Sequence, residues 1–141
     1  MKKTIAMTLI ILTLCVSFAL PSYAALPETD TVMPLWDNIS SVYSDIGFGA
    51  DGIASATGSL VRKTGVELTE GTMTVYKNVG GEWVYLTSAY NSATRGTLAV
   101  NADFAYESGV EYKSVFNATA YRNGVPESIE KTEYRTAPTL A

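Results

Sequence analysis

The side chains that could do chemistry in this chain are carboxylates and tyrosines, because the sequence contains no histidine and one cysteine. Histidine is the commonest general base and transition-metal ligand, so its absence removes most hydrolytic and zinc sites. Two carboxylates could still cleave a glycosidic bond if the fold placed them roughly 5 to 9.5 Å apart. The acidic residues of this chain are spread singly along the sequence, which is typical of a solvated surface. We therefore predict no catalytic residue and no cofactor. After residue 35 the acidic residues are Asp37, Asp45, Asp51, Glu67, Glu70, Glu82, Asp103, Glu107, Glu111, Glu127, Glu130 and Glu133.

Asp45 and Asp51 flank a glycine-rich turn, where oxygen ligands could bind a hard cation such as calcium. Their spacing, Asp-Ile-Gly-Phe-Gly-Ala-Asp-Gly, matches no calcium-binding loop. The turn also lacks the Lys-Ser/Thr pair and the helix that follow a phosphate-binding loop. We therefore predict no metal site, with a calcium site at this turn as the weaker alternative.

Aromatic side chains are the second group that could bind a ligand. Tyr76, Trp83, Tyr85 and Tyr90 gather around one predicted hairpin, and Trp36 precedes the first predicted strand. Tyrosine and tryptophan rings are typical of surfaces that bind sugars or proteins. The simpler interpretation is that one face of the hairpin fills the core while the other decorates the sheet. We keep all five residues as candidate ligand-binding aromatics.

The first 24 residues have the pattern of a secretory signal peptide. Lys2-Lys3 precedes an apolar run of 16 residues from Ile5 to Leu20, and Ala24 ends an A-x-A-like cleavage site. The run is shorter than the ~17 to 25 residues that cross a bilayer, which disfavours a retained membrane anchor. Cys15 lies within this apolar run, so lipidation of this cysteine, as in bacterial lipoproteins, is a further alternative to simple cleavage. We predict cleavage after Ala24 and a secreted protein, extracellular or loosely associated with the cell envelope.

Cleavage would leave residues 25–141, which is 117 residues and the size of one domain. This part has no cysteine and folds without disulfides, which indicates a bacterial exported protein. Removal of the two leading lysines leaves 8 of the 10 basic residues against 14 acidic ones, a net charge of 8 − 14 = −6. An acidic surface repels nucleic-acid backbones and anionic lipids. We therefore predict no nucleic-acid partner and no stable membrane insertion after cleavage.

Seven segments rich in Thr, Val, Tyr and Ser, separated by turn residues, predict β-strands, and no stretch has a helical period. Asn123-Gly124 is the loop preferred by a type I′ hairpin. Turn signals every roughly 8 to 12 residues predict an all-β, seven-stranded antiparallel sandwich, immunoglobulin-like or fibronectin-III-like, with a small barrel or jelly roll as the alternative. The predicted strands cover about 38–48, 53–61, 72–78, 82–88, 97–104, 112–121 and 125–135.

Individual residues add detail to this sandwich. Tyr112 follows a glycine-containing corner and is the candidate for a structural tyrosine corner. Small residues in the second strand, such as Gly58, predict a large side chain opposite, for which Trp36 and Trp83 are the candidates. Charges on the last strand predict a protected sheet edge, and we expect a monomer. The predicted organisation is a signal peptide over 1–24, an extended leader over 25–35, the sandwich over 36–135 and a flexible tail over 136–141.

Four segments of this chain resemble an uncharacterised family of small secreted proteins, a domain of unknown function, from Gram-positive, clostridium-like bacteria. They are Met33–Ser40 (Met-Pro-Leu-Trp-Asp-Asn-Ile-Ser), the hairpin from Thr72 to Trp83, the corner Gly109–Tyr112, and Tyr121–Glu127. The resemblance covers nearly all of the chain after the signal peptide. It implies export and a single β-sandwich, and it carries no activity.

Together these features favour a secreted, non-catalytic module that binds a protein or glycan ligand outside the cell or at the cell envelope. The alternative is a structural or self-associating protein of a surface layer or matrix, which would pair its sheet edges with other copies. Sheet-face aromatics favour the first function, and unprotected edges would favour the second.

Overall fold

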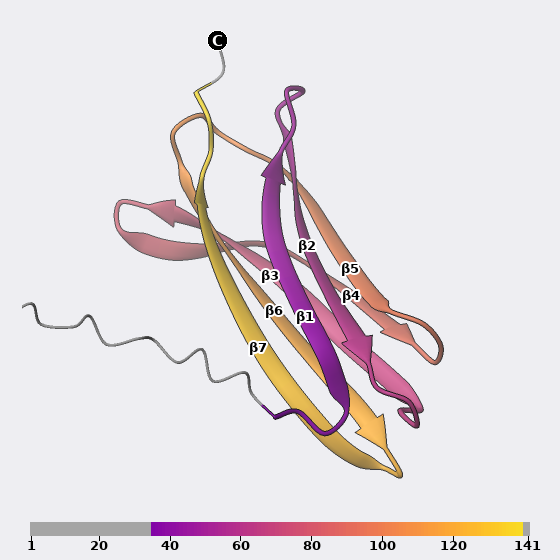
Figure 1. Ribbon diagram of the computed structural model, residues 1–141. Coiled ribbons are helices and arrows are strands. Elements are labelled where there is room, and N and C mark those ends of the chain that lie inside the picture. Colours follow the sequence, from indigo (N-terminus) through magenta and orange to yellow (C-terminus); the bar gives the residue numbers. More distant parts are fainter. Residues whose placement is uncertain (1–34, 140–141) are drawn as a thin grey trace, which may run out of the picture. The chain divides into compact units, whose positions relative to one another are not determined.

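The computed structural model describes residues 35–139, which form seven β-strands (Figure 1). The predicted signal peptide and all but the last residue of the predicted leader lie outside the described residues. Within residues 35–139 no helix is long and apolar enough to cross a membrane. The strands are β1 (Ile39–Phe48), β2 (Ile53–Arg62), β3 (Leu68–Val79), β4 (Glu82–Ala93), β5 (Leu98–Ala105), β6 (Glu111–Arg122) and β7 (Val125–Thr136).

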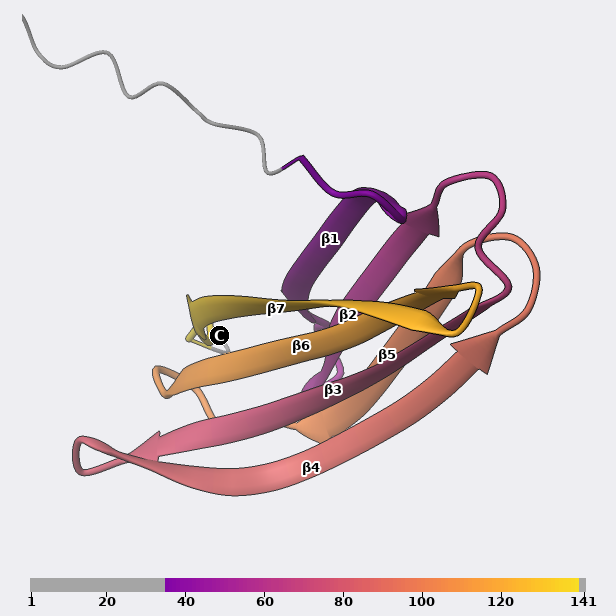
Figure 2. The same ribbon diagram turned by 90° about the horizontal axis from the view of Figure 1, so that it is seen from below.

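The strands form two antiparallel sheets, which Figure 2 shows as separate layers. One sheet has the strand order β1-β2-β5, and the other has the order β4-β3-β6-β7. In a constant-type immunoglobulin domain the fourth strand shares a sheet with the first, second and fifth strands. Here β4 pairs with β3 instead. The predicted all-β, seven-stranded antiparallel sandwich is therefore confirmed, with a strand order that differs from that of a constant-type immunoglobulin domain.

The core lies between the two sheets and follows the period-2 alternation of the strands. β5 alternates buried and exposed residues along its whole length, with Leu98 and Val100 among the buried ones. β3 and β6 alternate in the same way and contribute Met73 and Phe116. Each sheet therefore has one face in the core and an outer face that points away from the other sheet.

Phe116 of β6 occupies the space left by the small residues of β2. A Cβ atom on Gly58 would lie 2.4 Å from the Phe116 ring, closer than any real contact, so this position requires glycine. The expectation that Trp83 fills this space is wrong, because the Trp83 ring packs against Tyr134 on the outer face of the four-stranded sheet. Trp36 is half-buried and packs against the core.

Tyr112 has the hydrogen bond that a tyrosine corner requires. Its side chain is 1% exposed, and its hydroxyl oxygen accepts a hydrogen bond of 2.8 Å from the N–H of Glu107, five residues earlier. A second tyrosine, Tyr106, follows β5 of the three-stranded sheet. Its hydroxyl donates a hydrogen bond of 2.7 Å to the carbonyl of Gly49, in the turn that follows β1. These two bonds fix the loops at one end of the sandwich.

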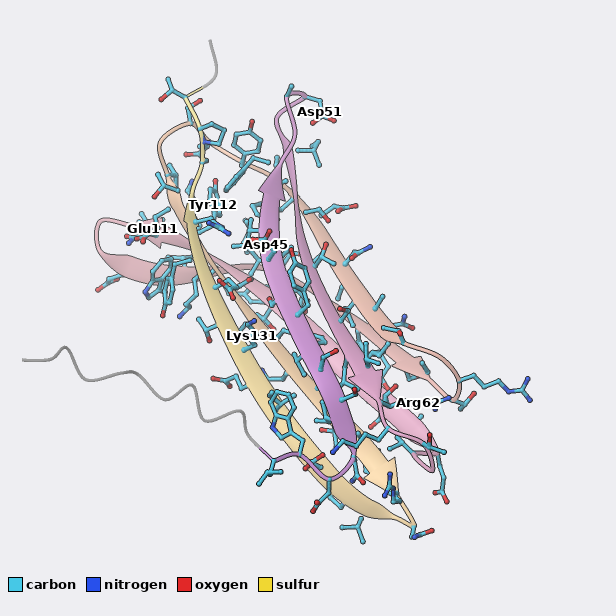
Figure 3. All side chains as sticks on the ribbon, viewed as in Figure 1. Asp45, Asp51, Arg62, Glu111, Tyr112 and Lys131 are labelled. Carbon is cyan, nitrogen blue, oxygen red and sulfur yellow. The ribbon has the colours of Figure 1, made fainter. Side chains whose placement is uncertain are left out.

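Charged side chains close the side of the sandwich where β1 and β7 lie next to each other. Glu127 of β7 accepts hydrogen bonds from three successive backbone N–H groups at the beginning of β1. Asp45 of β1, labelled in Figure 3, forms an ion pair of 3.0 Å with Arg135 of β7. The hydrogen bond from the Arg135 guanidinium lowers the pKa of the Asp45 carboxyl.

The described structure continues past residue 135, where the sequence predicts a flexible tail. β7 ends at Thr136, and Ala137 is buried. The N–H of Ala137 donates to the carbonyl of Val110 at 2.8 Å, and its carbonyl accepts from the N–H of Gly109 at 3.1 Å. These two bonds hold the end of β7 against the corner that precedes β6.

Candidate functional site

Four of the five candidate aromatics point to the outer face of the four-stranded sheet. Val75 of β3 is buried in the core, so its neighbour Tyr76 points outward. Tyr76 pairs with Tyr85 of β4 on one side and with Lys113 of β6 on the other. Lys113 in turn pairs with Tyr134 of β7. Because paired residues share a face, one row of side chains crosses all four strands.

A β-bulge in β4 brings the hairpin aromatics to one face. The register between β3 and β4 shifts after Val75 and leaves Leu86 as an extra residue. By alternation alone Tyr85 and Tyr90 would point to opposite faces, because an odd number of positions separates them. The bulge reverses the alternation, so Trp83 and Tyr85 point outward like Tyr90, which pairs with the outward residue Thr72.

We call Tyr76, Trp83, Tyr85 and Tyr134, together with Lys113, the aromatic cluster. The Tyr76 and Tyr85 rings meet edge to face with centroids 6.3 Å apart, and the Trp83 and Tyr134 centroids are 5.6 Å apart. The Lys113 ammonium lies 4.5 Å from the Tyr76 centroid and 5.0 Å from the Trp83 centroid, as in cation–π contacts. Despite these contacts Tyr85 remains 60% exposed and Tyr134 54% exposed.

Sequence reasoning missed Lys113 and Tyr134 of the aromatic cluster. They lie on β6 and β7, far along the chain from the β3–β4 hairpin, and only the pairing of β6 with both neighbouring strands brings them to Tyr76. A tyrosine and a lysine on the last two strands carry no spacing signal of their own. Knowledge of the strand order β4-β3-β6-β7 would have been needed to identify Lys113 and Tyr134 as members of the cluster.

A second group on the same outer face centres on Glu70 of β3. Its carboxylate accepts hydrogen bonds from the Tyr90 hydroxyl at 2.9 Å and the Tyr121 hydroxyl at 3.1 Å. The hydrogen bond to Glu70 raises the pKa of both tyrosines, because it stabilises the protonated phenol beside a negative charge. A raised pKa opposes formation of a phenolate nucleophile. We call these three residues the Glu70 group, and its role is to hold two rings in place.

Between the aromatic cluster and the Glu70 group, the outer face is covered mainly by hydroxyl and amide side chains. They belong to two rows of paired residues, which also contain Val115, Glu130 and the Tyr90 ring of the Glu70 group. We call this set the polar floor. It consists of Thr72, Thr74, Ser88, Asn117 and Thr132.

The remaining predicted site residues lie elsewhere. The backbone carbonyl of Trp36 accepts a hydrogen bond from Lys63, and its side chain packs against the core, so no contact joins Trp36 to the aromatic cluster. Asp45 is paired with Arg135, and Asp51 accepts from the N–H of Ile53 at 3.1 Å. Among residues 35–139 no group of three or more acidic side chains could hold a metal ion.

No protein-family model matches this chain, and no curated protein matches it. Among solved structures, the β-glucuronidase of Parabacteroides merdae aligns with a TM-score of 0.42 and 9% identity, over 67% of this chain and 13% of that one. The sporulation control protein Spo0M of Bacillus subtilis aligns with a TM-score of 0.32 and 14% identity, over 72% of this chain and 49% of that one. The chain spans less than half the length of each protein.

Proposed function

We propose that this protein is an exported, non-catalytic binding module, and that its ligand contacts the outer face of the four-stranded sheet. The observation that supports this most strongly is the aromatic cluster. The cluster brings together rings from β3, β4 and β7 on the outer face of the sheet, which is not part of the core. Tyr85 and Tyr134 remain more than half exposed there.

Contacts among these rings on the sheet face contribute only roughly 0.2–1 kcal/mol per pair, which does not require large aromatic side chains. Large aromatic side chains lower the free energy of folding when they are buried, whereas exposed ones commonly anchor a ligand or partner. The contacts within the cluster reduce the rotamer freedom of its rings before any ligand arrives. Side chains that are ordered in advance lose less entropy on binding. The aromatic cluster therefore has the properties of a prepared binding surface.

The first test concerns export, because the proposed site functions outside the cytoplasm. Expressed at full length in a Gram-positive host, the protein is expected in the medium or loosely bound to the wall. N-terminal sequencing of that material should begin at Ala25. Intact mass would reveal the alternatives: an uncleaved chain in the membrane fraction, or a lipid-bearing chain that begins at Cys15, would each contradict the proposal.

The second test asks whether the outer face binds. Binding of the exported protein to purified cell-wall polysaccharide and to isolated envelope proteins is expected to weaken at least about tenfold in Tyr85→Ala and Tyr134→Ala, as when an interface anchor is truncated. Tyr43→Ala is the matched control, because Tyr43 is 53% exposed but lies on the other sheet, on β1. Equal losses in all three variants, or none in the two cluster variants, would place the binding surface elsewhere.

Both sheet edges favour a monomeric binding module over the self-associating alternative. At the β7 edge of the four-stranded sheet, Pro126 is the second residue of the strand and several charged side chains follow it, and at the β4 edge the bulge at Leu86 interrupts the strand. Charges, proline and bulges are the devices that keep sheet edges from pairing with other chains. Light scattering of the exported protein at high concentration should therefore give the mass of one chain.

A further inference from the structure

We propose that the ligand of the outer face is a neutral glycan chain, which lies along the strands from the aromatic cluster to the Glu70 group and across the polar floor. This inference rests on the proposed function and narrows it to one ligand class. Three features of the face support it: its charge, the chemistry of the polar floor, and the separation of its two aromatic ends.

The charge of the face disfavours an acidic ligand. Lys113 is the one cation among its paired rows, and its ammonium is occupied by the Tyr76 and Trp83 rings. Three carboxylates, Glu70, Glu111 and Glu130, lie on the same face. An excess of negative charge repels acidic polysaccharides, teichoic-acid-like polyphosphates and nucleic acids. A neutral ligand meets no such barrier.

The polar floor suits a polyol better than a protein. Centres of protein interfaces are enriched in aromatic residues, methionine and arginine and are depleted in serine. Five of the eight side chains in the two polar-floor rows instead carry a hydroxyl or amide group and form the polar floor, and such groups both donate and accept hydrogen bonds. Sugar hydroxyl groups also donate and accept, and the apolar faces of sugar rings stack on aromatic rings. Rings at the ends with hydroxyl groups between them match that pattern.

The separation of the aromatic ends requires more than one sugar. Tyr85 and Tyr90 pair with positions four residues apart on β3, Tyr76 and Thr72. At about 3.4 Å per residue along an antiparallel strand, the two tyrosines stand about 14 Å apart along the sheet. One sugar ring is too short to reach both. An open sheet face also gives no closed end, so the interior of a chain can bind as well as its terminus.

The Glu70 group orients one end of this surface. Its carboxylate fixes the hydroxyl groups of Tyr90 and Tyr121, so both rings are held by their tips. Tyr90 is nevertheless 62% exposed and offers its ring to a ligand. Glu70 therefore acts as a positioning residue. Tyr90→Phe should keep the aromatic ring but remove its hydrogen bond to Glu70. It should therefore weaken binding less than Tyr90→Ala does.

The test is native affinity electrophoresis of the exported protein through gels that contain one soluble polysaccharide each. The neutral probes are hydroxyethyl cellulose, xylan, mannan and dextran, and carboxymethyl cellulose is the acidic counterpart of the first. We expect retardation by at least one neutral probe, lowered at least about tenfold in apparent affinity by Tyr85→Ala and by Tyr90→Ala, as for an interface anchor. Tyr43→Ala should migrate like the parent protein, and added salt should have little effect.

Chain length provides the second measurement. Oligosaccharides of the retarding polysaccharide should quench or shift the emission of Trp83 in a Trp36→Phe variant, where Trp83 is the only tryptophan. The corresponding monosaccharide should have no effect at the same concentration of sugar rings. Thermal unfolding of each variant shows whether a loss of binding reflects loss of the fold, and the exposed positions of Tyr85 and Tyr90 make that outcome distinguishable.

Three results would overturn this inference. Stronger retardation by carboxymethyl cellulose than by every neutral probe would assign an acidic ligand. Equal binding of monosaccharide and oligosaccharide would show that the ligand is not an extended glycan chain. No retardation by any polysaccharide, with Tyr85-dependent binding to an envelope protein, would leave the proposed function standing with a protein ligand. Absence of any Tyr85-dependent binding to polysaccharide or envelope protein would instead overturn the proposed function itself.

Discussion

Phe116→Ala is expected to destabilise the sandwich by about 3–5 kcal/mol, the range for removal of a buried aromatic side chain. Phe116 is fully buried, and its ring fills the space over both Gly58 of β2 and Gly71 of β3. Because neither glycine has a side chain that could move into the vacated space, the cavity will not collapse. Denaturant unfolding followed by far-ultraviolet circular dichroism measures the loss of stability.

A double-mutant cycle with Gly58→Ala checks the cause. In the parent chain the added methyl group meets the Phe116 ring at 2.4 Å and should cost at least the ~1–3 kcal/mol typical of overpacking. In the Phe116→Ala background the same methyl group enters the vacated space, so its cost should fall or reverse. Additive losses would show that the contact between these residues is not what makes glycine necessary.

Glu127→Ala is expected to cost at least about 1.5–3 kcal/mol, the value of one hydrogen bond to a charged group. The carboxylate of Glu127 accepts from the N–H groups of Asp37, Asn38 and Ile39 at 2.8, 2.7 and 3.1 Å. Asn38 and Ile39 are buried, so water cannot easily replace these bonds. Besides a lower unfolding free energy, hydrogen exchange of these three amides should accelerate.

Glu130→Ala on the same strand is the matched control for Glu127. Glu130 is exposed on the outer face, and its carboxylate forms no ion pair or hydrogen bond with another residue of the described chain. Its removal should change stability by no more than about 0.5 kcal/mol. Similar losses for both substitutions would indicate a general charge effect on β7. Fast exchange confined to the beginning of β1 in Glu127→Ala alone would support the specific role of this carboxylate.

These stability variants also separate the scaffold from the proposed site. The outer face draws side chains from all four strands of its sheet, so it exists only when β3 and β6 are packed on the core. Phe116→Ala should therefore weaken binding only as far as it unfolds the protein. Tyr85→Ala should weaken binding without unfolding it, because the Tyr85 side chain is mostly exposed.

Local patterns in the sequence predicted the elements of this fold well. The alternation from Leu98 to Phe104 appears in the structure as alternating burial along β5. Asn123 and Gly124 have φ angles of 51° and 74°, as a type I′ hairpin turn requires. Both features depend on residues close together in the chain, which is why they can be recognised from the sequence.

The sequence by itself determined the number of strands, the chemistry that is excluded, and the pattern of a signal peptide. It predicted the limits of β3 and β4 too narrowly, because β3 begins four residues before the predicted 72–78 and β4 continues five residues past the predicted 82–88. Glu70 and Tyr90 therefore lie outside the predicted strands. Only the tertiary structure decided that β4 pairs with β3, that Leu86 bulges, and that Lys113 and Tyr134 join the hairpin aromatics. Strand partners depend on contacts between distant residues. A bulge adds one residue without any compositional mark, yet it reverses the faces of every side chain beyond it. Which aromatic rings share a surface is therefore a property of strand pairing and register, and local sequence patterns do not specify either.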